Sequence, residues 1–280
     1  MPSPLHSCCS TLILSQVARA VELAKQFNAS TSPDCRIVGI KIICDGIIDA
    51  CTAGLSEPYL SSNSHSSDPV GAGIPLWTAD QLIPVVQAAT AANLQIALHA
   101  IGDGTIKTVI DVLSQHADPK FRPRVEHLEL SSAEDAIRLG KSGITASIQP
   151  VHADPAILRA WPRLLGPHRC DRAFAYREFA DNGAPLALGS DAPTAPHGPL
   201  ANVYVGVTRK SFRERGMDVG GTAENVVRNE GFQLVVCEAV AAVAVVATVE
   251  VDLADVVPLV GATVAEVDLE IGRASCRERV

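Results

Sequence analysis

The chain has 280 residues, of which 47% are hydrophobic and 19% are charged, so it is long enough and apolar enough to bury a sizeable core. This composition excludes an intrinsically disordered chain. The formal net charge of -8 argues against nucleic acid or an anionic membrane surface as the partner.

The cysteines show no disulfide scaffold. The chain has 8 of them, scattered and without a C-x-x-C pair, which favours a reducing compartment. The amino-terminal stretch MPSPLHSCCSTLILSQVARA has no basic segment, so we expect no signal peptide. The longest apolar run, AVAAVAVVATV, lies between Glu238 and Glu250 and is too short to span a bilayer. These features predict a cytoplasmic protein that binds neither membranes nor nucleic acid.

Hydrophobic periodicity predicts alternating helices and strands. The segment 17–27 has helical spacing, and the β-branched run 36–46 is typical of a buried strand. Further helices are expected at 78–94, 105–116, 131–143 and 172–183, and further strands at 94–100, 122–130, 144–150 and 184–193. Thr78 is the expected cap of one helix, and Ser131 with Glu134 has the spacing of a capping box at another.

Strands that alternate with helices favour parallel βαβ units, whose functional groups gather at the carboxyl ends of the strands. Polar side chains stand within or just beyond the expected strands: Lys41, His99, His127, Gln149, His152 and Asp191. In a β/α barrel these strand ends share one mouth. Because two imidazoles and a carboxylate are a suitable ligand set for zinc or a similar divalent ion, His99, His127 and Asp191 form a candidate metal site.

Each candidate also has a purely structural interpretation, and the residues alone leave both open. His99 could merely pack at a strand end, and His127 could be a hydrogen-bonded core residue. Lys41 could extend to the surface or pair with Asp45. Asp191 could cap the turn in the sequence GSDAP.

Four further residues are candidates for supporting roles around these side chains. Asp103 and Glu126 could orient the histidines by hydrogen bonding, or could be solvated charges. Gln149 and His152 could contact the substrate. All four follow or lie within expected strands, so they are expected near the same edge of the sheet.

Five ordered segments resemble a known family: VGIKIICDGIIDACTAGLSEPY, IALHAIGDG, RPRVEHLEL, ASIQPVHAD and LALGSDAPTAPHGPL. Together they cover residues 36–210 and are similar to the YtcJ-like branch of the amidohydrolase superfamily, amidohydrolase family 3, which includes N-substituted formamide deformylases. The resemblance implies an α/β fold of the metal-dependent hydrolase kind, here an incomplete TIM-type (β/α)8 barrel in which strands four to eight are present.

The resemblance also implies roles for individual residues. Lys41 matches the strand-four lysine that bridges two metals once it is carboxylated, and His99 and His127 match the strand-five and strand-six histidine ligands. Asp191 matches the strand-eight aspartate that binds metal and transfers the proton. The implied cofactor is one or two divalent ions, with zinc as the first expectation. The implied reaction is attack of a metal-bound hydroxide on a small amide or formamide substrate, with cleavage of a non-peptide C–N bond.

The chain departs from the family pattern in two places. The His-x-His pair of the family's first strand occurs nowhere in the sequence, and the match begins shortly before strand four. An incomplete barrel has open sheet edges, which favours association into homo-oligomers. The sequence is therefore interpreted as a fragment, a truncated gene model, or a protein whose missing strands lie on another chain. The alternative to an active hydrolase is an inactive remnant that has lost the metal and serves as a binding module. A serine hydrolase is disfavoured because the sequence lacks G-x-S-x-G.

The expected organisation has three parts. Residues 1–35 form a helical lead-in, and residues 36–218 form the partial barrel with the catalytic groups. Residues 219–280 are rich in valine and alanine and are unlike the family, so they are interpreted as non-native sequence from a shifted reading frame with an appended end.

Overall fold

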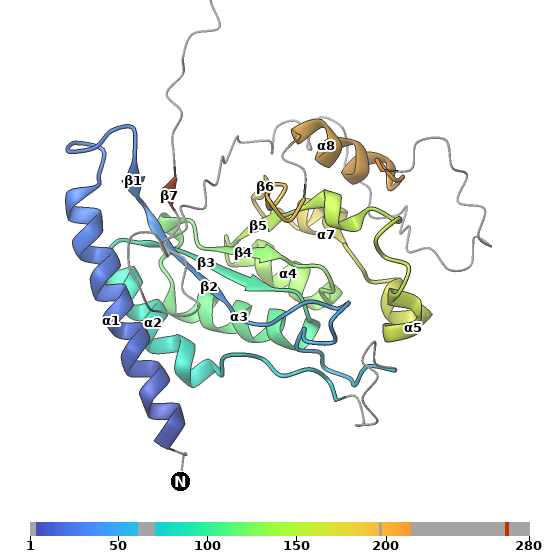
Figure 1. Cartoon of the computed structure of the whole chain (residues 1–280), viewed down its shortest axis with the longest axis horizontal. Helices are drawn as coiled ribbons and strands as arrows, with labels where there is room; N and C mark the ends of the chain where they lie inside the picture. Colours follow the sequence, from blue (N-terminus) through green and yellow to red (C-terminus); the bar gives the residue numbers. More distant parts are fainter. Residues whose placement is uncertain (1–3, 61–70, 196–197, 214–266, 269–280) are drawn as a thin grey trace, which may run out of the picture.

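A parallel sheet of five strands forms the centre of the fold (Figure 1). The structure, a computed structural model, describes residues 4–60, 71–195, 198–213 and 267–268. The strands are β2 (Gly39–Ile43), β3 (Gln95–Ala100), β4 (Arg124–His127), β5 (Thr145–Ile148) and β6 (Leu186–Leu188). They lie in the sheet in chain order and every neighbouring pair is parallel.

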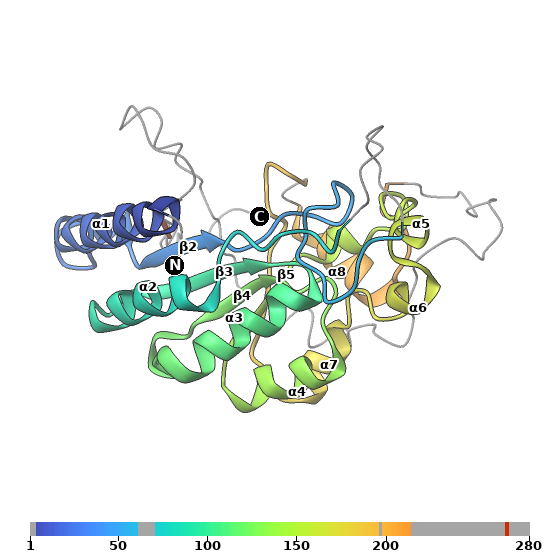
Figure 2. The ribbon, with the colours of Figure 1, turned by 90° about the horizontal axis from the view of Figure 1, so that it is seen from below.

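Helices cover one face of this sheet (Figure 2). They are α2 (Ala79–Ala91), α3 (Asp103–His116), α4 (Ala133–Lys141) and α7 (Tyr176–Asp181). Alternate residues of the strands are apolar and point toward them, including Ile42, Leu98 and Val125, each at most 1% exposed. Burying each of these side chains contributes roughly 1.5–3 kcal/mol, so the helical face holds the sheet in place.

The opposite face of the sheet is polar. Lys41, Gln95, His99, Arg124 and Glu126 alternate with the apolar residues, and the register places His99 beside Glu126 on the neighbouring strand. Arg124 donates a hydrogen bond of 2.8 Å to the Oε1 atom of Gln95, and it also pairs with Glu126. We call this side the polar face; most of the predicted site residues belong to it or to the loops at its end.

Two helix starts test the capping predictions. The backbone amide of Thr78 donates to the Oε1 atom of Gln81 at 2.9 Å, and α2 begins directly after Thr78, as predicted. The prediction for α4 is wrong by one residue. Its cap is Ser132, whose hydroxyl accepts from the amide of Asp135 at 3.0 Å, because Ser131 is buried in front of the helix.

The remaining elements surround the sheet. Helix α1 (Pro4–Gln26) lies beside α2 at one side of the sheet and begins earlier than predicted. The predicted strand at 36–46 is divided, because β1 (Arg36–Ile37) pairs antiparallel with β7 (Val267–Asp268). The other elements are η1 (Pro119–Phe121), η2 (Pro150–Ala153), α5 (Trp161–Leu165), α6 (Pro167–Cys170) and α8 (Pro199–Thr208).

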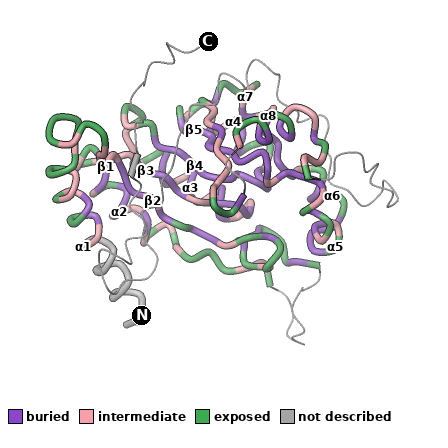
Figure 3. The backbone as a smooth tube through the Cα atoms, turned by 45° about the horizontal axis from the view of Figure 1, so that its top comes forward, coloured by how far each residue is buried: buried purple, intermediate pink, exposed green. Residues whose placement is uncertain are grey.

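Burial follows this architecture (Figure 3): β3 and β4 are buried along most of their length, α3 is buried on one side, and much of α1 is exposed. Among the described residues, no helix combines the length and the apolarity that crossing a bilayer requires. Of the predicted carboxyl-terminal segment 219–280, only β7 belongs to the described residues, so the predicted boundaries and origin of that segment stay predictions.

Candidate metal centre

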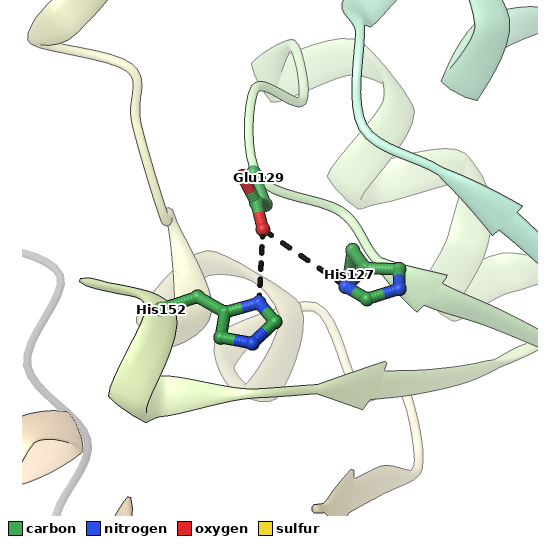
Figure 4. A group of neighbouring side chains, drawn as sticks. All are labelled: His127, Glu129 and His152. Carbon is green, nitrogen blue, oxygen red and sulfur yellow. Dashed lines mark hydrogen bonds and ion pairs between the residues drawn. The ribbon is translucent and has the colours of Figure 1, made fainter. Parts of the chain in front are cut away.

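His127, Glu129 and His152 meet where β4 and β5 end. The Oε1 atom of Glu129 lies 3.2 Å from Nδ1 of His152 and 3.9 Å from Nδ1 of His127. Figure 4 shows one carboxylate oxygen facing both rings. One potential ligand atom from each of the three side chains lies within 4.8 Å of the others, and no side chain is more than 15% exposed. The group is therefore compact and shielded from water.

Two nitrogen atoms in this group lack hydrogen-bond partners. Nδ1 of His127 and Nε2 of His152 are buried, and neither has a partner in the described part of the chain. Leaving a buried polar atom unpaired costs about 1–3 kcal/mol. Imidazole and carboxylate are ligands that zinc and similar ions prefer, so the donor set fits a divalent cation.

The backbone at the end of β4 explains why His127 belongs to this group. His127 and Leu128 have φ angles of 74° and 52°, in the left-handed region that residues other than glycine seldom adopt. Backbone hydrogen bonds hold the turn; for example, the amide of Leu128 donates to the carbonyl of Ala100 at 3.1 Å, and the amide of Phe174 donates to the carbonyl of Glu129 at 2.7 Å. Such local strain persists where the surroundings enforce it and is concentrated at functional sites.

The turn brings His127 next to the histidine of β3. The ring centroids of His99 and His127 are 4.3 Å apart, and those of His127 and His152 are 5.6 Å apart with nearly parallel planes. His127 therefore stands between the other two imidazoles. The prediction that His99 and His127 lie together is confirmed at the level of position; their role as ligands stays a prediction.

Burial and neighbouring charges set the protonation of these rings. Burial lowers the pKa of His127 well below its ordinary value, and His99, His152 and Lys41 lower it further. Burial also lowers the pKa of His99, although the Asp45 carboxylate opposes this effect. Neutral imidazoles keep a lone pair for a metal. His127 and His99 are thus in the protonation state that a metal requires.

His152 differs from the other two histidines. Burial alone would disfavour its charged form, but the hydrogen bond and the charge of Glu129 raise the pKa of His152 above its ordinary value. Asp191 adds to this increase, and it also raises the pKa of His99. The Asp191 carboxylate is therefore close enough to act on imidazoles at both ends of the row.

Lys41 and Asp191 approach the histidines from two different strands. Lys41 lies in the middle of β2 on the polar face and is half-buried, and its ammonium group lowers the pKa of both His99 and His127. Asp191 follows β6 with a φ angle of 56°, and its carbonyl accepts from the amide of Thr194 at 2.8 Å. Lys41 and Asp191 thus each change the pKa of two of these imidazoles, and their roles as ligands stay predictions.

The structure does not support an ion pair with Asp45 as the structural reason for a lysine at position 41 of this strand. Asp45 is fully buried and accepts hydrogen bonds from three backbone amides, while its Oδ1 atom lies 3.5 Å from Nε2 of His99. Asp45 thus contacts a candidate ligand, a relationship that the sequence analysis did not predict.

The predicted supporting residues have different surroundings. Asp103 accepts hydrogen bonds from the amide of Ser56, at 2.9 Å, and from its hydroxyl, so it anchors the loop after β2 to α3. Glu126 pairs with Arg124 and accepts from the Nε2 atom of Gln149 at 3.3 Å. Asp103 and Glu126 were expected to orient the histidines by hydrogen bonding. The hydrogen bonds described here go to other residues instead.

Glu129 is the member of the centre that the sequence analysis missed. The signal was present in RVEHLEL, where an acidic residue follows His127 at the second position. In a continuing strand, these two side chains would share a face. However, the strand ends at His127, so only the left-handed turn determines that the carboxylate faces His152.

Comparison with known proteins relates this geometry to a family. The family model described as "Amidohydrolase family" matches residues 3–244. The chain is 30% identical over 200 residues to "Putative amidohydrolase YtcJ" of Bacillus subtilis (strain 168), covering 70% of this chain and 36% of that protein. It is also 30% identical over 198 residues to "Protein LONG AFTER FAR-RED 3" of Arabidopsis thaliana, covering 69% and 33%. The chain spans about a third of the length of these two relatives.

Two solved structures share the fold. An uncharacterized metal-dependent hydrolase from Pyrococcus horikoshii OT3 superposes with a TM-score of 0.60 at 24% identity, covering 74% of this chain and 38% of that chain. A second such hydrolase, from Pyrococcus furiosus, gives a TM-score of 0.54 at 24% identity, covering 74% and 41%. The parallel sheet with its helices is thus the predicted part of a TIM-type barrel, and the chain belongs to the amidohydrolase family.

Proposed function

We propose that the centre is that of a metal-dependent amidohydrolase that cleaves non-peptide C–N bonds in small amide or formamide substrates. The observation that carries this proposal is the buried group of His127, Glu129 and His152, in which two nitrogen atoms lack partners. Family membership supports the same chemistry. A bound divalent ion, with zinc as the first candidate, would activate water and polarise the substrate carbonyl.

The residues of this chain would divide the work as follows. His127, Glu129 and His152 would hold the ion, and His99 would offer a further imidazole at the edge of the group. Asp191 would take a proton from water on its carboxylate and return it to the leaving nitrogen. Its charge raises the pKa of both His99 and His152, which supports a role for Asp191 near these imidazoles.

Lys41 is proposed to become carboxylated. As an ammonium group it lowers the pKa of His99 and His127, so it disfavours a nearby cation. A carbamate would replace that positive charge by an anionic oxygen ligand. Lys41 is half-buried on the polar face. Carboxylation would join its nitrogen to carbon dioxide and release to solvent the protons that the ammonium group loses.

A second candidate function is ligand binding without turnover. The absence of any His-x-His pair from the sequence favours it, because the residues present offer fewer ligands than the family pattern. The same centre would then bind a metal or an amide without hydrolysing it. In either case the proposed partner is a small molecule, the proposed location is the cytoplasm, and a homo-oligomer is the proposed assembly.

Metal content and turnover, measured on the same preparation, test the proposal. The purified chain is dialysed against metal-free buffer, loaded with zinc, and analysed for bound metal and for release of amine from formamide-type substrates. His127→Gln and Glu129→Gln should lose bound zinc, whereas the exposed control His168→Gln should retain it. Zinc without turnover would favour the binding module. A folded chain that binds no divalent ion would contradict the hydrolase, and one that binds neither a divalent ion nor an amide would contradict both forms of the proposal.

A further inference from the structure

Backbone amides fix the carboxylate of Asp45, which follows β2. Its Oδ2 atom accepts hydrogen bonds from the amides of Gly54 and Gly102, at 3.0 and 2.9 Å, and its Oδ1 atom accepts from the amide of Ile101 at 3.0 Å. Asp45 is completely buried. Three amide donors offset the cost of removing a carboxylate from water, and together they permit a single orientation.

Glycines allow the close approach that creates this arrangement. A Cβ atom at Gly102 would collide with the backbone of Gly54, and a Cβ atom at Gly54 would collide with the side chain of Thr105. The glycine after the β3 strand in IALHAIGDG thus lets the loop after β2 contact the start of α3. The contact places Asp45 directly beside His99.

His99 presents one nitrogen atom to two acceptors. Its Nε2 atom lies 3.5 Å from Oδ1 of Asp45 and 3.4 Å from the carbonyl oxygen of Gly46. A carbonyl oxygen has no hydrogen to donate, so a hydrogen bond with Gly46 requires a hydrogen on Nε2. In a neutral imidazole, the lone pair is then on Nδ1.

We propose that Asp45 is the positioning residue of His99: together with the Gly46 carbonyl, it selects the tautomer with hydrogen on Nε2 and presents Nδ1 as the metal-binding atom. The role of Nδ1 rests on the proposed function, whereas the tautomer is a property of the chain without metal. Carboxylates and carbonyls that hold the second nitrogen of a histidine are a general means of orienting metal ligands.

Nuclear magnetic resonance of histidine labelled with nitrogen-15 tests the tautomer directly. Long-range proton–nitrogen correlations are recorded on the metal-free chain above the ordinary histidine pKa of about 6.5, with His99→Gln for assignment. His99 should show a protonated Nε2 and an unprotonated Nδ1. In Asp45→Asn, the loss of the anionic acceptor should shift the population toward the other tautomer.

Asp103→Asn is the matched control, because Asp103 also anchors the loop after β2 to α3 but does so through Ser56. It should leave the His99 tautomer unchanged. Zinc affinity should fall about 10- to 100-fold in Asp45→Asn, and by less in Asp103→Asn.

Two results would overturn the positioning role: a dominant Nδ1–H tautomer in the wild-type chain, or equal tautomer populations in wild type and Asp45→Asn. If Asp45→Asn fails to fold, the wild-type spectrum can still overturn the proposal, because a dominant Nδ1–H tautomer would contradict it. A wild-type chain that shows the expected tautomer, loses it in Asp45→Asn and binds no zinc supports the positioning by Asp45 and rejects the proposed function instead.

Discussion

The carboxylate of Glu129 lies 3.2 Å from Nδ1 of His152, although the two residues come from loops after different strands. The contact depends on parallel strands that end at the same edge of a sheet. It joins an anion to a largely buried imidazole that solvent screens only weakly. Each group should therefore affect both the charge of the other and the affinity of the centre for a cation.

The first prediction concerns Glu129 as a ligand. Glu129→Gln keeps the size of the side chain but removes the negative charge, so zinc affinity should fall by at least about tenfold. Competition with a chromophoric chelator measures this change. Glu134→Gln, on the exposed surface of α4, is the matched control and should retain the wild-type affinity. Equal affinities of the Glu129 and Glu134 variants would remove Glu129 from the site.

The second prediction concerns the proton on His152. The Glu129 hydrogen bond and charge raise the pKa of His152 against the opposing effect of burial. In Glu129→Gln only a weak neutral partner remains, so the pKa of His152 should fall below its wild-type value. Titration of the metal-free chain by nuclear magnetic resonance measures the difference. An unchanged pKa would mean that the contact with Glu129 is absent in solution.

The third prediction links His127 to the pH dependence of stability. Burial lowers the pKa of His127 well below its ordinary value of 6.5, so between these two values the unfolded chain binds more protons than the folded chain. This residue therefore makes stability fall as the pH decreases below about 6.5, by at most about 1.4 kcal/mol for each pH unit.

Urea unfolding at several pH values, for the wild type and for His127→Gln, isolates this contribution. The difference in unfolding free energy between the two proteins should shift in favour of the variant as the pH decreases. The comparison is needed because His99, His152 and Asp45 also titrate with altered pKa values. A difference that is independent of pH would contradict a buried, neutral His127.

The sequence predicted those features that depend on simple geometric rules. Parallel strands bring their carboxyl ends to one edge, which is why His99, His127 and Asp191 could be expected together from residues far apart in the chain. The helices α2, α3 and α4 have strong periodicity, and they lie within a few residues of the predicted ranges.

Other features depend on local backbone geometry that periodicity does not reveal. The direction of Glu129 depends on the left-handed turn at His127 and Leu128. The contact of Asp45 with His99 depends on the close approach of two loops. Helices α5 and α6 were missed because segments of 5 and 4 residues are too short for a periodic pattern.

The fourth prediction tests the apolar face of the sheet, on which the position of His99 depends. Leu98 is fully buried and points to the helices, while the next residue of β3 points to the polar face. Leu98→Ala should lower the free energy of unfolding by about 2–5 kcal/mol, since the cavity cannot collapse between sheet and helices. Leu200→Ala is the control: that side chain is 81% exposed, so its loss should change stability by at most about 0.5 kcal/mol. Urea unfolding measures both variants.

The same variant separates the support of the sheet from the chemistry of the centre. Asp45 contacts His99 on the polar face, which is opposite to Leu98. A Leu98→Ala chain that still folds should therefore lose stability but keep the His99 tautomer of the wild type.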